Sequence, residues 1–90
     1  MIVMTRGINN KVAEDTPFAK HVTNGLKKFF AKDWGTVPPE DWEANDYDDK
    51  QLNKGEYGRI LASYGDDISQ DRFWIIRDTE VVTVLFPSEY

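Results

Sequence analysis

The strongest pattern in this sequence is an apolar side chain at every third or fourth position between residues 18 and 30. The series consists of Phe18, Val22, Leu26, Phe29 and Phe30. In a helix of 3.6 residues per turn these side chains share one side, with lysines and an asparagine between them. The sequence therefore predicts an amphipathic helix that needs a second apolar layer to cover its stripe.

The start of this helix is also marked in the sequence. Asp15 or Thr16 can accept a hydrogen bond from an unpaired backbone N–H, and Pro17 suits the first helical position because its missing N–H costs nothing there. Ile8 and Val12, four residues apart, indicate a further helical segment before this start. We therefore expect the N-terminal third of the chain to be helical.

Pro38 and Pro39 end this region, and the acidic residues that follow them favour a new helix N-terminus. Residues 40–53 have no clean apolar stripe, and their aspartates and asparagines are poor helix formers. We expect a short or irregular helix here.

The last third of the sequence is typical of β-structure. Ile60, Ala62 and Tyr64 alternate with residues of the opposite face, and the apolar runs FWII and VVTVLF follow. The sequence GDDISQD has the composition of a turn. We predict one α+β domain over residues 1–90, with N-terminal helices at about 5–53 packed on a C-terminal three-stranded antiparallel meander at about 56–87.

Catalytic and cofactor motifs are absent from the sequence. It has no cysteine, one histidine (His21) and no glycine-rich phosphate loop. We expect no enzymatic activity, no catalytic residue, no cofactor and no metal. The open alternative is a metal site formed by His21 with carboxylates of Glu14, Asp15 or residues 40–49. Structural zinc sites usually have several Cys or His ligands, which argues against this alternative.

The sequence also lacks targeting signals. No apolar run approaches the roughly 20 residues that span a bilayer, and the first residues lack the apolar region of a signal peptide. The absence of cysteine fits a reducing compartment. We expect a cytoplasmic protein.

Charge is distributed unevenly along the chain. Residues 1–32 carry six basic and two acidic side chains, whereas residues 33–90 carry five basic and fourteen acidic ones, for a net charge of −5. A negative protein lacks the positive surface on which most nucleic-acid affinity depends. The asymmetry indicates either attraction between the two parts or a charged face offered to a partner.

The acidic residues are densest between residues 33 and 49, among two tryptophans. If residues 40–49 are helical, their carboxylates lie about 2.5 Å apart along the axis, comparable to the charge spacing of about 1.7 Å in duplex DNA. Tryptophan rings often anchor protein interfaces. The candidate partner-binding surface consists of Asp33, Trp34, Glu40, Asp41, Trp42, Glu43, Asp46, Asp48 and Asp49.

A purely structural role is the alternative for these residues: the acids solvate the surface or pair with lysines of the preceding helix, and the aromatic rings fill the core. Like charges three residues apart repel. If repulsion dominates, mild acidification should stabilise the fold, and if pairing dominates, it should destabilise it.

Several short sequences follow one another in a fixed order: MTRGIN, DWG, GRILASY, WII and TVLFPSEY. In this order they resemble, over almost the whole chain, a family of small uncharacterised proteins of bacteria, phages and plasmids. The resemblance implies that Met1-Ile-Val extends upstream of the family start and that the protein belongs to a mobile element. Small acidic proteins in that setting are often inhibitors of host defence.

Together these features predict a small acidic inhibitor of anti-CRISPR or anti-restriction type. Its partner would be a basic nucleic-acid-binding surface of a nuclease, and it would block nucleic-acid loading without contacting nucleic acid or membrane itself. The alternative is a non-enzymatic accessory interaction module of a phage or plasmid that binds a protein through its sheet, with Trp74 in the contact.

Overall fold

A computed structural model describes residues 1–65 and 72–90 of the chain, so the predicted turn GDDISQD lies outside the described residues apart from Gly65. The elements in chain order are β1 (Ile2–Met4), α1 (Arg6–Glu14), α2 (Thr16–Phe30), α3 (Pro39–Asn53), β2 (Arg59–Tyr64), β3 (Phe73–Asp78), β4 (Val81–Leu85) and a 3₁₀ turn η1 (Pro87–Glu89). The α+β class is as predicted.

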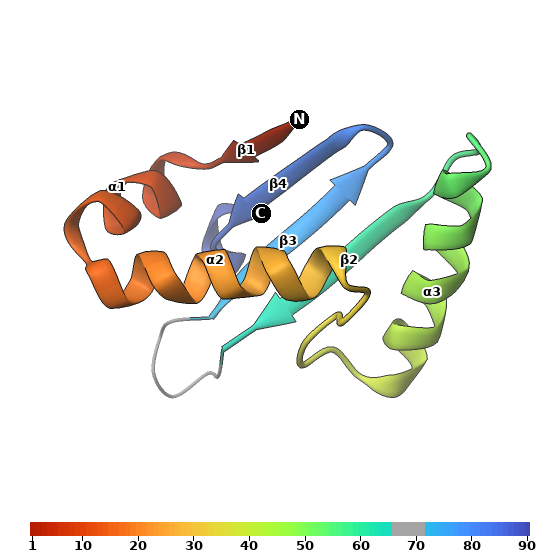
Figure 1. Cartoon of the computed structure of the whole chain (residues 1–90), viewed down its shortest axis with the longest axis horizontal. Coiled ribbons are helices and arrows are strands. Elements are labelled where there is room, and N and C mark those ends of the chain that lie inside the picture. The colour runs from red at the N-terminus through yellow and green to blue at the C-terminus, as the bar shows by residue number, and fades with distance from the viewer. Residues whose placement is uncertain (66–71) are drawn as a thin grey trace.

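The sheet has four strands in the order β1-β4-β3-β2 (Figure 1). Strands β2, β3 and β4 pair antiparallel, and β1 pairs parallel with β4. The prediction of a three-stranded antiparallel sheet after all the helices is therefore wrong. Three residues are too few to show a periodicity, and the partner of β1 lies about 80 residues further along the chain, so no local pattern revealed this strand.

Helices α1 and α2 cover one face of the sheet, and α2 runs across the strands (Figure 1). Phe18, Val22 and Phe29 of the predicted stripe are buried in the core, while Leu26 packs beside it and Phe30 is 54% exposed. The Asp15 carboxylate caps α2 by accepting a hydrogen bond from the Phe18 N–H (3.1 Å), one of the two predicted caps. The amphipathic helix and its start are confirmed.

Gly25 allows this close packing of α2 on the sheet. A Cβ at this position would lie 2.5 Å from Cζ of Phe73 on β3. Glycine weakens a helix by about 1 kcal/mol relative to alanine. Here the absence of a side chain lets the helix contact the Phe73 ring directly.

The strand residues that face the helices form the other half of the core. Ala62, Ile75 and Val84 lie side by side on β2, β3 and β4, and each is fully buried. The alternation predicted for β2 is confirmed, because Ile60, Ala62 and Tyr64 all belong to this core.

The opposite face of the sheet, called the second face below, carries Leu61, Ile76 and Thr83 in one row and Trp74 and Leu85 in the next. Ile76 and Leu85 are buried, but neither belongs to the main core. None of the three helices in the described part of the chain packs over this face (Figure 1). The structure therefore has two layers, with one sheet face left to the strands' own side chains and the C-terminal residues.

The two ends of the described chain are joined through Glu89. Its carboxylate accepts hydrogen bonds from the Thr5 hydroxyl (2.6 Å), the Gly7 N–H (3.0 Å) and the Phe86 N–H (2.9 Å). Thr5 is the N-cap residue of α1, yet its own side chain makes no cap bond. Glu89 therefore supplies the negative charge and the acceptor that the N-terminus of α1 needs.

In residues 1–65 and 72–90, no helix is both long and apolar enough to cross a bilayer.

Candidate binding surface

Helix α3 is a regular fifteen-residue helix rather than the short or irregular one predicted. It lies beside β2, the edge strand of the sheet (Figure 1). The side-chain amide of Asn45 donates to the Leu61 carbonyl (2.8 Å) and accepts from the Leu61 N–H (3.3 Å). The Asp48 carboxylate accepts from the Arg59 N–H (3.2 Å). Polar side chains of α3 thus take the place of a neighbouring strand.

The loop before α3 completes this edge. The Ser63 N–H donates to the Trp34 carbonyl (3.2 Å), and the Thr36 N–H donates to the Ser63 carbonyl (2.8 Å). Gly35, between them, has a φ of 78°, and a Cβ there would overlap the Ser63 carbonyl. Only glycine lets the loop approach β2 this closely.

Four of the predicted binding residues are tied into this arrangement. Trp34 is 1% exposed, and its indole N–H donates to the Asp46 carboxylate (2.8 Å). The Asp49 side chain is 11% exposed and pairs with the ammonium group of Lys32, whose side chain is about half exposed (2.8 Å). Trp42 packs partly buried against the core. These side chains therefore have the structural role that the sequence offered as the alternative to partner binding.

Asp33 also has an internal role. Its carboxylate accepts from the Gly35 N–H (3.0 Å), and its backbone carbonyl accepts from the buried Tyr64 hydroxyl (2.7 Å). Burial raises the pKa of Tyr64 above its ordinary value, and the Asp33 charge raises it further. The Tyr64 hydroxyl therefore stays protonated as a donor at physiological pH.

Glu40, Asp41 and Glu43 are the predicted site residues that remain available. All three are exposed, and within the described residues no hydrogen bond or ion pair engages their side chains. Glu40 and Asp41 lie in the first turn of α3, where the helix dipole favours negative charge. Tyr47 on the same helix is 64% exposed. We call Glu40, Asp41 and Glu43 the acidic patch.

A groove joins the acidic patch to the second face of the sheet. Its volume is about 260 Å³, and it is lined by Asp41, Ala44 and Asn45 of α3 and by Arg59 and Leu61 of β2. The two surfaces that the sequence suggested as alternatives, the acidic segment and the sheet, therefore meet at one place.

Next to this groove lies a contacting cluster of Arg59, Tyr90 and Trp74. The Arg59 guanidinium donates to the Tyr90 hydroxyl (2.7 Å) and lies 5.4 Å from the centre of its ring. The Tyr90 ring meets the Trp74 ring edge-on, with centroids 5.7 Å apart. Its hydrogen bond to Tyr90 raises the pKa of Arg59, so the guanidinium stays charged. The sequence suggested Trp74 for a contact, but not its two partners, because Tyr90 lies 31 residues from Arg59.

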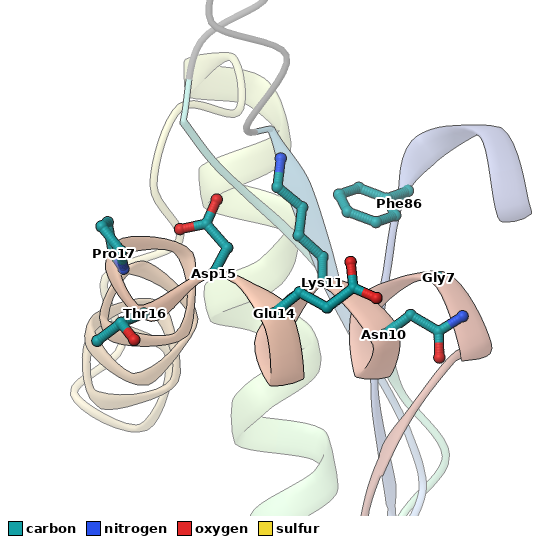
Figure 2. A pocket seen from close by; sticks show the side chains of 8 residues that line it. All are labelled: Gly7, Asn10, Lys11, Glu14, Asp15, Thr16, Pro17 and Phe86. Carbon is teal, nitrogen blue, oxygen red and sulfur yellow. The ribbon is translucent and has the colours of Figure 1, made fainter.

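A second depression lies between α1 and the start of α2 (Figure 2). It is open and has a volume of about 680 Å³. Of its lining residues, Asp15 already caps α2, and the Lys11 ammonium lies over the Phe18 ring, 4.7 Å from its centre.

His21, the candidate for the alternative metal site, packs against aromatic rings. Its ring meets Phe73 edge-on at 4.9 Å and Phe18 at 6.2 Å between centroids. Across residues 1–65 and 72–90, no three His, Cys, Asp or Glu side chains come together as a metal would require. Among the described residues, His21 therefore forms no such group of three with Glu14, Asp15 or the acids of α3.

Comparisons of this chain with protein-family models, curated proteins and solved structures find no match. The family resemblance noted in the sequence therefore stays a prediction.

Proposed function

We propose that this protein is a small non-enzymatic inhibitor that binds a basic, nucleic-acid-binding surface of a host-defence nuclease and blocks nucleic-acid loading. The proposal includes the anti-CRISPR or anti-restriction setting that the resemblance to phage and plasmid proteins implies. The observation that supports it is that the acidic residues between positions 33 and 49 fall into two groups. Four aspartates are used inside the fold, whereas the acidic patch has no internal partner among the described residues.

The acidic patch suits a basic partner for electrostatic reasons. Three carboxylates within the first five residues of α3 project from one rigid helix, on a chain of net charge −5. Fixed charges of one sign steer an oppositely charged partner and speed association. An occupied basic channel cannot take up nucleic acid at the same time, so inhibition requires no chemistry by this protein.

A charge-reversal pair tests this proposal. Asp41→Lys combined with Glu43→Lys should weaken inhibition of DNA binding at least tenfold, measured by fluorescence anisotropy on a panel of CRISPR-effector and restriction nucleases. Glu14→Lys combined with Glu80→Lys is the matched control, because it changes net charge equally on exposed residues outside the patch. Equal loss of inhibition by both pairs, or loss by neither, would show that the acidic patch is not the working surface.

The second candidate is an accessory interaction module of a phage or plasmid that binds a protein through its sheet. The observation that favours it is the second face, which has no helix over it in the described chain and carries the Arg59–Tyr90–Trp74 cluster. A pull-down separates the two candidates. A partner retained at high salt favours the sheet, because exposed charge contacts are screened within about 10 Å at 0.1 M salt.

A further inference from the structure

We propose that the outer edge of β1 pairs antiparallel with β1 of a second copy of this chain, so that two four-stranded sheets join into one across a two-fold axis. β1 is the edge strand on the side of the sheet opposite to β2 and α3 (Figure 1). The inference concerns self-association and does not depend on the inhibitor proposal.

The backbone groups of β1 point in two directions. The Met1 C=O (2.8 Å) and the Thr5 N–H (3.0 Å) are bonded to backbone groups of β4. In a strand the backbone groups of alternate residues point to the same side, so those of Ile2 and Met4 point away from β4. Within residues 1–65 and 72–90, no hydrogen bond engages these outward groups.

The two edges of the sheet differ in how they are protected. On β2, the backbone groups of Leu61 and Ser63 are already bonded to α3 or to the loop before it. On β1, residues 1–5 include no lysine, proline or acidic residue, the side chains that commonly protect an edge. Ile2 and Val3 are 50% and 40% exposed. An exposed apolar strand with unpaired backbone groups is a template for another strand.

A second β1 satisfies the hydrogen-bonding groups of this edge. In an antiparallel pairing centred on Val3, Ile2 of each copy lies opposite Met4 of the other, and each such pair exchanges two hydrogen bonds. Both N–H and both C=O groups that point outward from each copy are then bonded. The two Val3 residues lie opposite each other on the axis, in the type of pair whose side chains come closest.

The side chains of β1 also match those of a second copy. Met4 packs against the core, and Ile2, two residues away, lies on the same side of the sheet. Val3 is in register with Thr83 and so lies on the second face. The pairing therefore places Ile2 beside Met4 on one side of the sheet and Val3 beside Val3 on the other. Apolar cross-strand pairs of this kind stabilise a sheet.

The short length of this edge favours a preformed strand over a disordered peptide as its occupant. Ordering a flexible peptide costs backbone entropy at every residue, and an edge of three residues offers few contacts to offset that cost. In a second copy β1 is already held extended by β4. The contact is far smaller than a standard protein interface, so we expect a weak dimer with a dissociation constant on the order of 0.1–1 mM.

Sedimentation equilibrium at protein concentrations from about 10 μM to about 1 mM measures this association. We expect the average mass to rise from that of the monomer toward that of the dimer. In an equal mixture of ¹³C-labelled and unlabelled protein, isotope-filtered NOEs should connect Ile2 of one copy with Met4 of the other. A monomer throughout this range, or a dimer without the Ile2–Met4 contact, would overturn the inference.

A pair of matched variants locates the contact. Val3→Lys should weaken association about tenfold, because it places like charges side by side on the axis and leaves every backbone group in place. Val81→Lys is the control, since it makes the same change at a valine that is 37% exposed and belongs to β4. Equal effects of the two variants, or undiminished association of Val3→Lys, would refute the proposed edge.

A proline variant tests the backbone pairing directly. Ile2→Pro removes an N–H that points away from β4 and should abolish the association. The ¹⁵N signals of β4 should stay at their native positions, which shows that the β1–β4 pairing is intact. Association that persists in a folded Ile2→Pro variant would contradict pairing through the Ile2 N–H.

Discussion

Replacing Glu89 by glutamine should destabilise the fold through the N-terminus of α1. Glutamine keeps one acceptor oxygen for the Thr5 hydroxyl and the Phe86 N–H, but presents an NH₂ group to the Gly7 N–H, where donor would face donor. The change removes one hydrogen bond, the charge assistance of two others and the favourable interaction with the helix dipole.

The size of the effect follows from the exposure of this site. Hydrogen bonds to charged groups contribute about 1.5–3 kcal/mol, but the three bonds of Glu89 are exposed to solvent, which reduces their net value. We expect Glu89→Gln to lower the free energy of unfolding at pH 7 by about 1–2 kcal/mol. A domain of this size loses roughly 4–8 °C in melting temperature for each kcal/mol.

The pH dependence gives the same prediction an independent check. Desolvation by burial raises the pKa of Glu89, but the hydrogen bonds from Thr5, Phe86 and Gly7 outweigh it, so the folded pKa lies below its ordinary value. The stabilisation is therefore fully present above the unfolded pKa of about 4.3 and is lost as pH falls through the folded pKa. Wild type and Glu89→Gln should differ at pH 7 and converge at about pH 2–3.

Urea unfolding followed by circular dichroism at pH 7 and at pH 2.5 measures both effects. Glu80→Gln is the control, since it removes an exposed carboxylate from the β3–β4 turn and should change stability by less than about 0.5 kcal/mol. A Glu89→Gln effect no larger than that of the control, or one that persists undiminished at pH 2.5, would refute this account of Glu89.

Three further changes test the fold around the candidate surface. Asn45→Ala should cost roughly 2–3 kcal/mol in urea unfolding, because it leaves a backbone N–H and C=O of β2 unpaired; an effect below about 1 kcal/mol would mean that water replaces the amide. Asp49→Asn should lower stability at pH 7 by about 1 kcal/mol through its pair with Lys32, whereas a rise would indicate that repulsion dominates in α3. Gly25→Ala should lower the melting temperature despite its helix-propensity gain of about 1 kcal/mol, because the new methyl group overlaps the Phe73 ring; a higher melting temperature would contradict the packing.

Local regularities were sufficient to predict much of the fold. The stripe from Phe18 to Phe29 and the cap at Asp15 predicted α2, because helix periodicity and capping depend on residues a few positions apart. The alternation at Ile60, Ala62 and Tyr64 predicted β2 and the face that these three residues share for the same reason. The prediction of a short or irregular helix at residues 40–53 was wrong. The aspartates there are poor helix formers in isolation, but they belong to a regular helix that packs against β2.

The candidate surface depended on contacts that composition does not encode. The sequence identified a dense group of acids by itself, and this determined that some charged surface would exist. Which acids remain at the surface was decided by tertiary contacts: Asp46 bonds the indole of Trp34, Asp48 bonds the edge of β2, and Asp49 pairs with Lys32. Such partners depend on where distant segments meet.

The same distinction explains β1 and the second face. By itself the sequence determined one amphipathic helix, a β-rich C-terminal third and a negative net charge. Only the tertiary structure placed Ile2–Met4 beside β4, brought Tyr90 between Arg59 and Trp74, and joined Asp41 to the sheet in one groove. Hydrophobic periodicity reports which side of an element is buried, whereas the neighbour of an element is set by the packing of the whole chain.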